Sequence, residues 1–126
     1  MKLGTLFTIN AIIAVLFGLA LVFIPTPMMS LYGVTLNDGG LFSTRIMGAA
    51  YLGIAIISWL VRNSPSSSDI RAIVLAFFVT DTISFIIGVI YKLQGVSNAL
   101  GWTNVLLFLL MGLGFGYFYF VKPKTN

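Results

Sequence analysis

The sequence predicts an all-α, polytopic membrane protein: four transmembrane helices in an antiparallel bundle, with both termini cytoplasmic. Of its 126 residues, 59% are hydrophobic and 8% charged, whereas soluble domains carry about 25% charged residues. The mean hydropathy is +1.05. The apolar residues gather in four runs of about 20 residues, which is enough to cross about 30 Å of hydrocarbon. Because these runs lack two-residue alternation, helices are favoured over a β-barrel.

The length allows a single domain, residues 1–126, that contains four predicted spans. Short polar turns join the second span to the third and the third to the fourth, which favours antiparallel neighbours. The predicted spans are about 5–24, 39–61, 70–93 and 98–121.

The first span is expected to end before Pro25 and Pro27, because proline lacks the backbone N–H that a helix needs. Its apolar run is longer than a signal-peptide core and has no small-residue cleavage site, so we expect it to be retained in the membrane. Between it and the second span, residues 25–37 are apolar but too short to cross. We expect a short interfacial helix or loop there, with Tyr32 as a headgroup anchor.

Side chains that cap helices stand at the predicted starts of the later spans. A short polar side chain at a helix start accepts a hydrogen bond from a free backbone N–H. We expect Asp38 to cap the second span, Asp69 the third, and Ser97 or Asn98 the fourth.

The basic residues predict the orientation. Cytoplasmic flanks of membrane helices are enriched in Lys and Arg. With the N-terminus inside, Lys92 lies in an outer connection and Arg45 lies in the outer part of a span. Five others then lie inside: Lys2, Arg62, Arg71, Lys122 and Lys124.

The residue inventory excludes several function classes. The net charge of +4 comes from scattered residues, so no basic stripe for a nucleic acid is present. The sequence has no Cys, His or Glu, and its acidic residues are Asp38, Asp69 and Asp81. Thiolate, His-based and paired-carboxylate catalysis lack their residues, as do metal sites. We therefore expect no enzyme and no metal, and the cofactor question stays open.

Small residues predict how the helices pack. Without a hydrophobic driving force between helices in lipid, small side chains let backbones approach closely. The first span carries Ala14 and Gly18, and the second Ala49 and Gly53. Internal packing of the bundle is the simpler interpretation, and docking of a partner subunit on GLGFG of the fourth span is the alternative. The predicted packing residues of the last two spans are Ala72, Ala76, Thr80, Ser84, Gly88, Gly112 and Gly116.

Asp81 is the one acidic residue inside a predicted span, close to the bilayer midplane. An aspartate there costs about 2.5–3.5 kcal/mol on insertion scales, so it is expected to face the bundle or a water-filled cavity. The antiparallel register around a turn near residue 65 sets Asp81 opposite Ala50, with Arg45 about 7.5 Å further out. Asn104 on the fourth span lies at the height of Arg45.

Arg45, Asp81 and Asn104 are therefore predicted to form an intramembrane polar cluster. One interpretation is a buried ion pair with a hydrogen-bond network that fixes helix register. Another is a polar pocket for a proton, ion or headgroup, in which Asp81 changes protonation. A third has no contact between them, with a neutral Asp81 hydrogen-bonded locally.

Short motifs and single residues spread over nearly the whole chain form a recognisable set: LYGV (31–34), DGGL (38–41), Arg45 with Gly48, YLG (51–53), Asp81, GVSNALGW (95–102) and GFGYF (114–118). With them the chain resembles a set of small, uncharacterised four-helix proteins of the bacterial inner membrane, distantly similar to DoxX-like proteins. The resemblance implies a bacterial cytoplasmic membrane location and a four-helix bundle. It implies no reaction and no catalytic residue.

Three functions fit these observations. The first is a non-enzymatic accessory subunit that packs against a larger energy-converting or transport complex, or against copies of itself. The second is a small transporter or channel that uses Asp81, with Arg45 as gate or counter-ion. The third is a binder of an apolar ligand such as a lipid, a quinone or a photosynthetic pigment, because large apolar side chains are abundant. The bilayer is the expected environment in each case.

Overall fold

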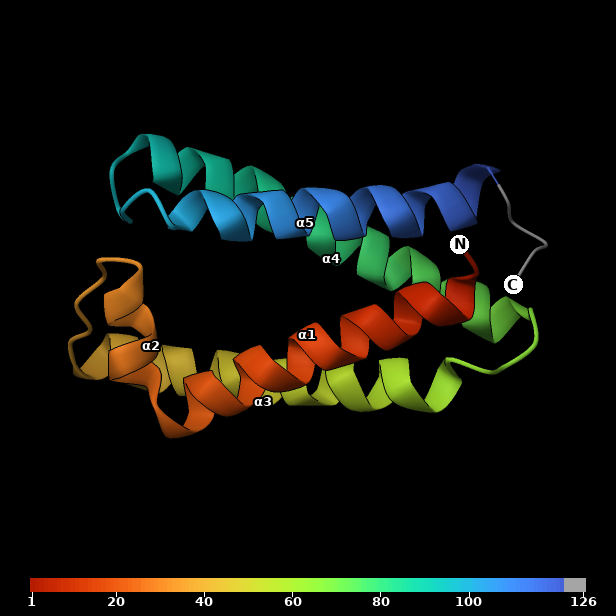
Figure 1. Cartoon of the computed structure of the whole chain (residues 1–126), viewed down its shortest axis with the longest axis horizontal. Helices are drawn as coiled ribbons and strands as arrows, with labels where there is room; N and C mark the ends of the chain where they lie inside the picture. The colour runs from red at the N-terminus through yellow and green to blue at the C-terminus, as the bar shows by residue number, and fades with distance from the viewer. Residues whose placement is uncertain (122–126) are drawn as a thin grey trace.

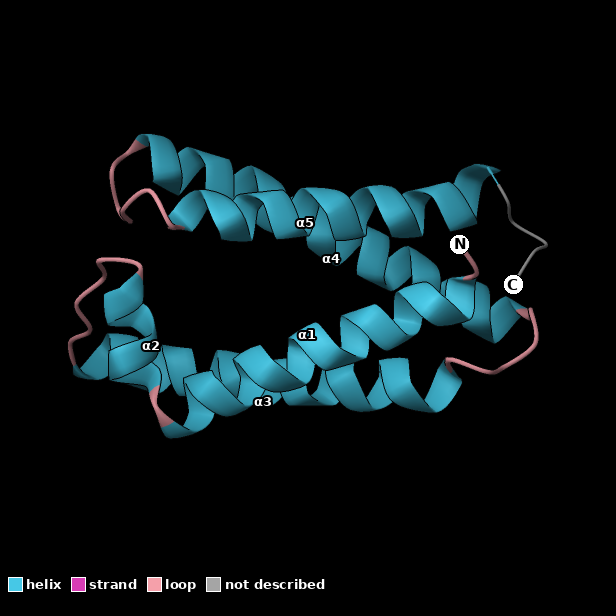
Figure 2. Cartoon of the chain, viewed as in Figure 1, coloured by secondary structure: helices cyan, strands magenta, loops and turns pink. Residues whose placement is uncertain are grey.

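The computed structural model describes residues 1–121, and every regular element in this range is helical (Figures 1 and 2). The all-α prediction is confirmed. Lys122 and Lys124, which contribute to the predicted orientation, lie outside the described residues. The elements in chain order are α1 (Leu3–Phe23), α2 (Pro25–Leu31), α3 (Asp38–Val61), α4 (Ser68–Leu93), α5 (Gly101–Gly116) and the π-helical turn η1 (Tyr117–Val121).

Four of these helices are long and apolar enough to cross a membrane: Leu3–Phe23, Asp38–Val61, Ser68–Leu93 and the continuous helix Gly101–Val121. They match the four predicted spans, with ends that differ by at most three residues. Between the first two, the sequence Pro25–Leu31 forms the short helix α2. Pro25 stands in its first turn, where the missing N–H of proline has no cost.

The helix caps lie close to the predicted positions but on other residues. Asn37, not Asp38, accepts a hydrogen bond from Gly40 N at 2.7 Å. Ser67, not Asp69, accepts one from Ile70 N at 3.2 Å. In both places two residues at most two positions apart are able to cap, and the one with extended backbone takes the role.

α5 begins later than predicted. Its first flanking residue, Leu100, has no side-chain capping bond. Asn98 instead accepts a hydrogen bond from Leu100 N at 3.0 Å, so it orders the turn before the helix. The predictions of Asp38, Asp69 and either Ser97 or Asn98 as helix caps were therefore wrong.

The bundle consists of two antiparallel helix pairs, α1 with α3 and α4 with α5 (Figure 1). In the first pair, Gly18 and Gly48 face each other at the crossing. A Cβ on Gly48 would lie 2.9 Å from Gly18 O, so only glycine permits this approach. The prediction of Gly18 is confirmed, but Ala49 and Gly53 are exposed, and nothing lies within 4 Å of a Cβ on Gly53.

In the second pair, Gly112 and Gly116 of α5 pack against α4. A Cβ on Gly112 would lie 3.4 Å from Asp81 Cβ, and one on Gly116 would lie 2.9 Å from the ring of Phe78. From the α4 side, a Cβ on Gly88 would lie 3.2 Å from Val105. These glycines bring the two backbones close along most of α5.

The predicted row on α4 does not form one packing face. Ala72, Ala76 and Thr80 are exposed, whereas Ser84 and Gly88 are partly buried. Four residues advance a helix by about 40° beyond one turn, so a row of five such positions winds around it. Its two ends therefore lie on different sides of α4.

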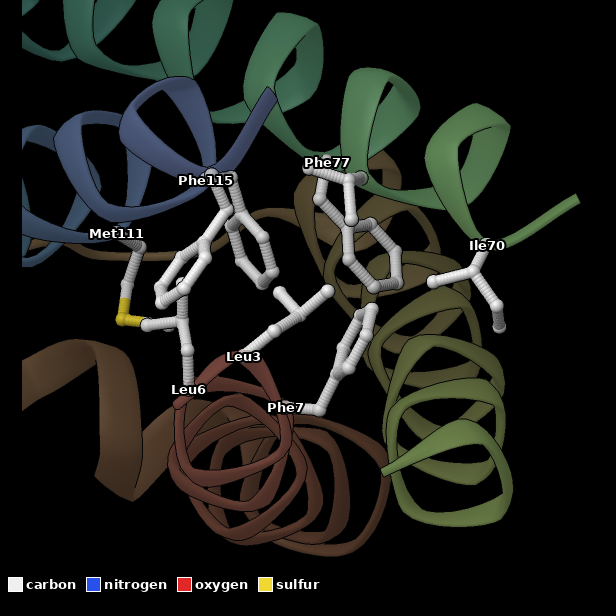
Figure 3. Packing of buried hydrophobic residues seen from close by; sticks show 9 residues of the cluster. Leu3, Leu6, Phe7, Ile70, Phe77, Met111 and Phe115 are labelled. Atoms are coloured by element: carbon white, nitrogen blue, oxygen red, sulfur yellow. The ribbon is translucent and has the colours of Figure 1, made fainter. Parts of the chain in front are cut away.

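An aromatic cluster joins the two pairs at the end of the bundle that holds Leu3, here called the termini end (Figure 3). Phe7 of α1, Phe77 of α4 and Phe115 of α5 meet there, with ring centroids 5.3–6.2 Å apart. This spacing is typical of favourable ring pairs. Leu3, Leu6 and Met111 pack around these rings in the same buried cluster.

At the opposite end, called the α2 end, hydrogen bonds join two loops. Asn98 N donates to Tyr32 O at 2.8 Å, and Asn98 Nδ2 donates to Leu31 O at 2.9 Å. We call these contacts the loop clasp. Tyr32 is buried, so the prediction that it anchors in the headgroups was wrong. Its hydroxyl turns inward and donates to Asn104 Oδ1 at 3.2 Å.

The charges divide between the two ends as the sequence predicts. Lys2, Arg62 and Arg71 flank the starts or ends of helices at the termini end, and Arg62 and Arg71 each stack on an aromatic ring, 3.7 Å from Trp59 and 4.4 Å from Tyr119. Arg45 and Lys92 belong to the α2 end.

Candidate functional site

A cavity of about 420 Å³ lies between the two helix pairs, in the stretch between the aromatic cluster and the loop clasp. The pairs converge at the termini end and stand apart toward the α2 end (Figure 1). Its size falls within the ~300–1,000 Å³ range of small-molecule sites. All four spans and α2 contribute to the wall, whose residues are Asn10, Ile13, Ala14, Phe17, Leu21, Met28, Met29, Tyr32, Met47, Ala50, Tyr51, Ile54, Phe77, Thr80, Asp81, Ser84, Asn104, Leu107, Phe108 and Met111.

Features of the fold already described line the two ends of the cavity. Phe77 and Met111 belong both to the aromatic cluster and to the wall. At the other end, Tyr32 and Asn104 belong to the wall and are hydrogen-bonded to each other. The contacts that hold the pairs together therefore also define the length of the cavity.

Asp81 stands in this wall, close to the middle of α4. α5 packs closely against α4 at this position, since a Cβ on Gly112 would lie 3.4 Å from Asp81 Cβ. Thr80 and Ser84 line the same cavity from α4, and Tyr51 lines it from α3.

Arg45 takes a different partner. Its guanidinium donates a hydrogen bond to Val22 O at 3.1 Å, and the residue is exposed. Val22 belongs to the last turn of α1, where backbone carbonyls lack helical donors and the helix dipole favours a cation. Arg45 thus binds the end of α1.

The three residues of the predicted polar cluster are only partly brought together. Asp81 and Asn104 both line the cavity, but Asn104 is bonded to Tyr32 and Arg45 is not part of the wall. Within residues 1–121, no ion pair joins Arg45 to Asp81. The height of Arg45 along the bundle does not decide its partner. Arg45 and the carbonyl of Val22 lie toward the same end of the bundle, whereas Asp81 lies near the middle of its helix, and the guanidinium binds the carbonyl.

Two polar groups of the site were not predicted. Tyr51 follows Ala50, the residue that the register estimate sets opposite Asp81, and both line the cavity with it. The same estimate therefore offered a signal for Tyr51. Asn10 donates from Nδ2 to Ser58 Oγ at 3.0 Å, which satisfies a fully buried hydroxyl of α3. Its partner on α3 follows only from how the two helices pack.

The cavity wall is mostly apolar but contains one acidic residue. Asp81 supplies the single carboxyl of the wall, and the remaining side chains are mostly Ile, Leu, Met and Phe. In the described part of the chain, no group of three or more His, Cys, Asp or Glu residues is placed to hold a metal ion. The arrangement suits an apolar molecule with one polar group better than a metal ion.

Comparisons with known proteins give one match. No curated protein and no solved structure matches the chain. A relationship to DoxX-like proteins is not shown; four apolar helices fit a membrane protein of unknown function. The matching family model is a domain of unknown function, DUF8292, and it covers residues 1–121. The chain belongs to the DUF8292 family.

Proposed function

We propose that this multi-pass membrane protein binds a small, largely apolar molecule within the bilayer, in the cavity between its two helix pairs. The observation that carries the proposal is the cavity itself, about 420 Å³ in volume and lined by all four spans. Ligand sites are mostly apolar, with a few polar groups that orient the ligand, and they occur between the helices of bundles. Asp81, Thr80 and Tyr51 are such polar groups here.

The role proposed is non-catalytic. The cavity contains one carboxyl and no histidine, cysteine or lysine, so general acid–base pairs and activated nucleophiles lack their components. The proposed location is the bacterial cytoplasmic membrane, with the termini end inside. Lys2, Arg62 and Arg71 gather at that end, as cytoplasmic flanks of membrane helices commonly do.

A cavity-filling substitution tests the binding proposal. Ala50 lines the cavity from α3, and Ala49 beside it is exposed and outside the wall. Ala50→Phe is expected to displace the ligand, whereas Ala49→Phe is the matched control with the same added ring. The chain is purified in mild detergent, and small molecules extracted from each variant are compared by mass spectrometry.

The expected result is a molecule enriched in extracts of the wild type and of Ala49→Phe and depleted in those of Ala50→Phe. An absorption spectrum of the same samples identifies a quinone or pigment. Identical extracts from all three proteins, together with equal binding of added apolar probes, would refute the proposal.

The other two functions expected from the sequence remain separate proposals. An accessory role is supported by the little surface outside the spans, since the connection between α3 and α4 is only residues 62–67. Transport through Asp81 is supported by its position in the cavity wall, but the predicted Arg45 counter-ion is bonded to α1 instead. Mild purification tests the accessory role, because an accessory subunit is expected to co-purify with its complex. A proteoliposome flux assay that compares the wild type with Asp81→Asn tests transport.

A further inference from the structure

The charge of the cavity wall discriminates between classes of ligand. Asp81 supplies its single carboxyl, and no Lys, Arg or His belongs to the wall. Arg45 donates to Val22 O, and Lys92 Nζ donates to Ser97 O at 3.2 Å near the α2 end. A fatty acid or other anion that entered the cavity would therefore meet a carboxyl and no cation.

A cation that entered the cavity would be attracted by the same carboxyl. In a medium of low dielectric constant, a carboxylate attracts a cation far more strongly than in water. Charge-assisted hydrogen bonds are also stronger than neutral ones. Thr80 and Ser84, which line the cavity on the same helix as Asp81, add hydroxyl oxygens that accept further hydrogen bonds from an ammonium group.

The aromatic rings of the cavity wall independently favour a cation over an anion. Phe17, Phe77 and Phe108 line the cavity, and Tyr51 lines it from α3. The face of an aromatic ring attracts a cation, and sites for organic ammonium ions combine such rings with few other polar groups. Met28 and Met29 at the α2 end supply flexible, polarisable surface that fits apolar bodies of varied shape.

We infer that the ligand of this cavity is a lipid-soluble amine, with its ammonium group beside Asp81 and its apolar body against the Phe and Met side chains. This inference rests on the proposed function, since it names the class of molecule that the cavity binds. The carboxyl gives the ligand its orientation, and the apolar wall accounts for most of the buried area.

Three naphthalene derivatives that differ only in their polar group test the inference: 1-naphthylmethylamine, 1-naphthalenemethanol and 1-naphthoic acid. Their partition between protein-containing and empty nanodiscs is measured by equilibrium dialysis. The wild type is expected to bind the amine about tenfold or more tightly than the alcohol, because the hydrogen bond of an ammonium to a carboxylate is charge-assisted and that of the alcohol is weaker. The acid is expected to bind weakest.

Asp81→Asn is expected to reduce the ratio of amine to alcohol affinity toward one. Asp69→Asn is the control, because Asp69 is exposed in the first turn of the same helix and outside the cavity. It is expected to leave the ratio unchanged. The comparison of amine with acid on the wild type needs no variant, so it holds even where Asp81→Asn fails to fold.

The outcomes separate this inference from the proposed function. Equal affinity of the wild type for acid and amine would overturn the inference, as would an unchanged ratio in a folded Asp81→Asn protein. The proposed function would survive either result if Ala50→Phe still abolished binding of all three probes. Unchanged binding of every probe by Ala50→Phe would overturn both.

Discussion

The contact between Gly18 and Gly48 makes a sharp prediction about what holds α1 against α3. In Gly48→Ala, the new Cβ would lie 2.9 Å from Gly18 O, 2.9 Å from Val22 N and 2.8 Å from Val22 Cγ2. Two of these three atoms belong to the backbone of α1, which cannot rotate away. The helices must therefore separate by several tenths of an ångström to reach the ordinary contact distance of 3.4 Å.

The cost follows from packing. A radial gap of about 0.5–1 Å already forfeits a quarter to a half of the dispersion energy of each contact across it. Overpacking of this kind typically destabilises a protein by about 1–3 kcal/mol. The gain in helix propensity from Gly to Ala, about 0.5–1 kcal/mol, acts in the opposite direction.

Gly53→Ala isolates the packing cost. Gly53 lies on the same helix, and nothing lies within 4 Å of a Cβ built on it. Both variants share the propensity gain, so the difference between them is the packing cost of about 1–3 kcal/mol. Reversible unfolding in mixed micelles, followed by circular dichroism, measures the free energy of unfolding of each. Equal stability of the two variants would refute the proposed close approach of α1 and α3.

Three further predictions concern the contacts around the cavity. Phe115→Ala removes a ring that is 0% exposed and is expected to destabilise the protein by about 3–5 kcal/mol, while Leu113→Ala, 62% exposed on the same helix, changes stability little in a thermal melt. Asn10→Ala leaves the buried Ser58 hydroxyl without its donor and is expected to cost about 1–3 kcal/mol in chemical unfolding, and full stability of Asn10→Ala would argue against this contribution. Asn98→Ala removes the side-chain bond of the loop clasp, from Nδ2 to Leu31 O, and keeps the backbone bond to Tyr32 O. It is expected to speed hydrogen exchange in residues 25–37, and unchanged exchange there would show that this side-chain bond does not hold these loops.

The fold was largely predictable because its signals are long and strong. Four apolar runs and the two prolines after the first run define the spans and α2. The helix starts were less predictable, because Asn37 stands beside Asp38 and Ser67 stands close to Asp69. Local sequence does not decide which of two adjacent capping residues adopts the extended backbone that capping requires.

The sequence predicted how far along the bundle the residues of the candidate site lie, but it did not predict their hydrogen-bond partners. The antiparallel register set Asp81 opposite Ala50, and both line the cavity. Which face of α3 meets α1 is decided by Gly48, while Gly53 of the same helix stays open, and small-residue spacing alone does not distinguish them. The partner of Arg45 depends on that same rotation, because it brings the guanidinium to Val22 O.

The central claim is that the space between the two helix pairs holds a small apolar molecule. Crystals of the protein grown with 1-bromonaphthalene test it directly, because anomalous diffraction locates the bromine atom. The account predicts a bromine peak inside the cavity, between Phe77, Phe108 and Met111, and its loss in Ala50→Phe. Bromine peaks confined to the lipid-facing surface, with the two helix pairs packed together where the cavity stands, would contradict it.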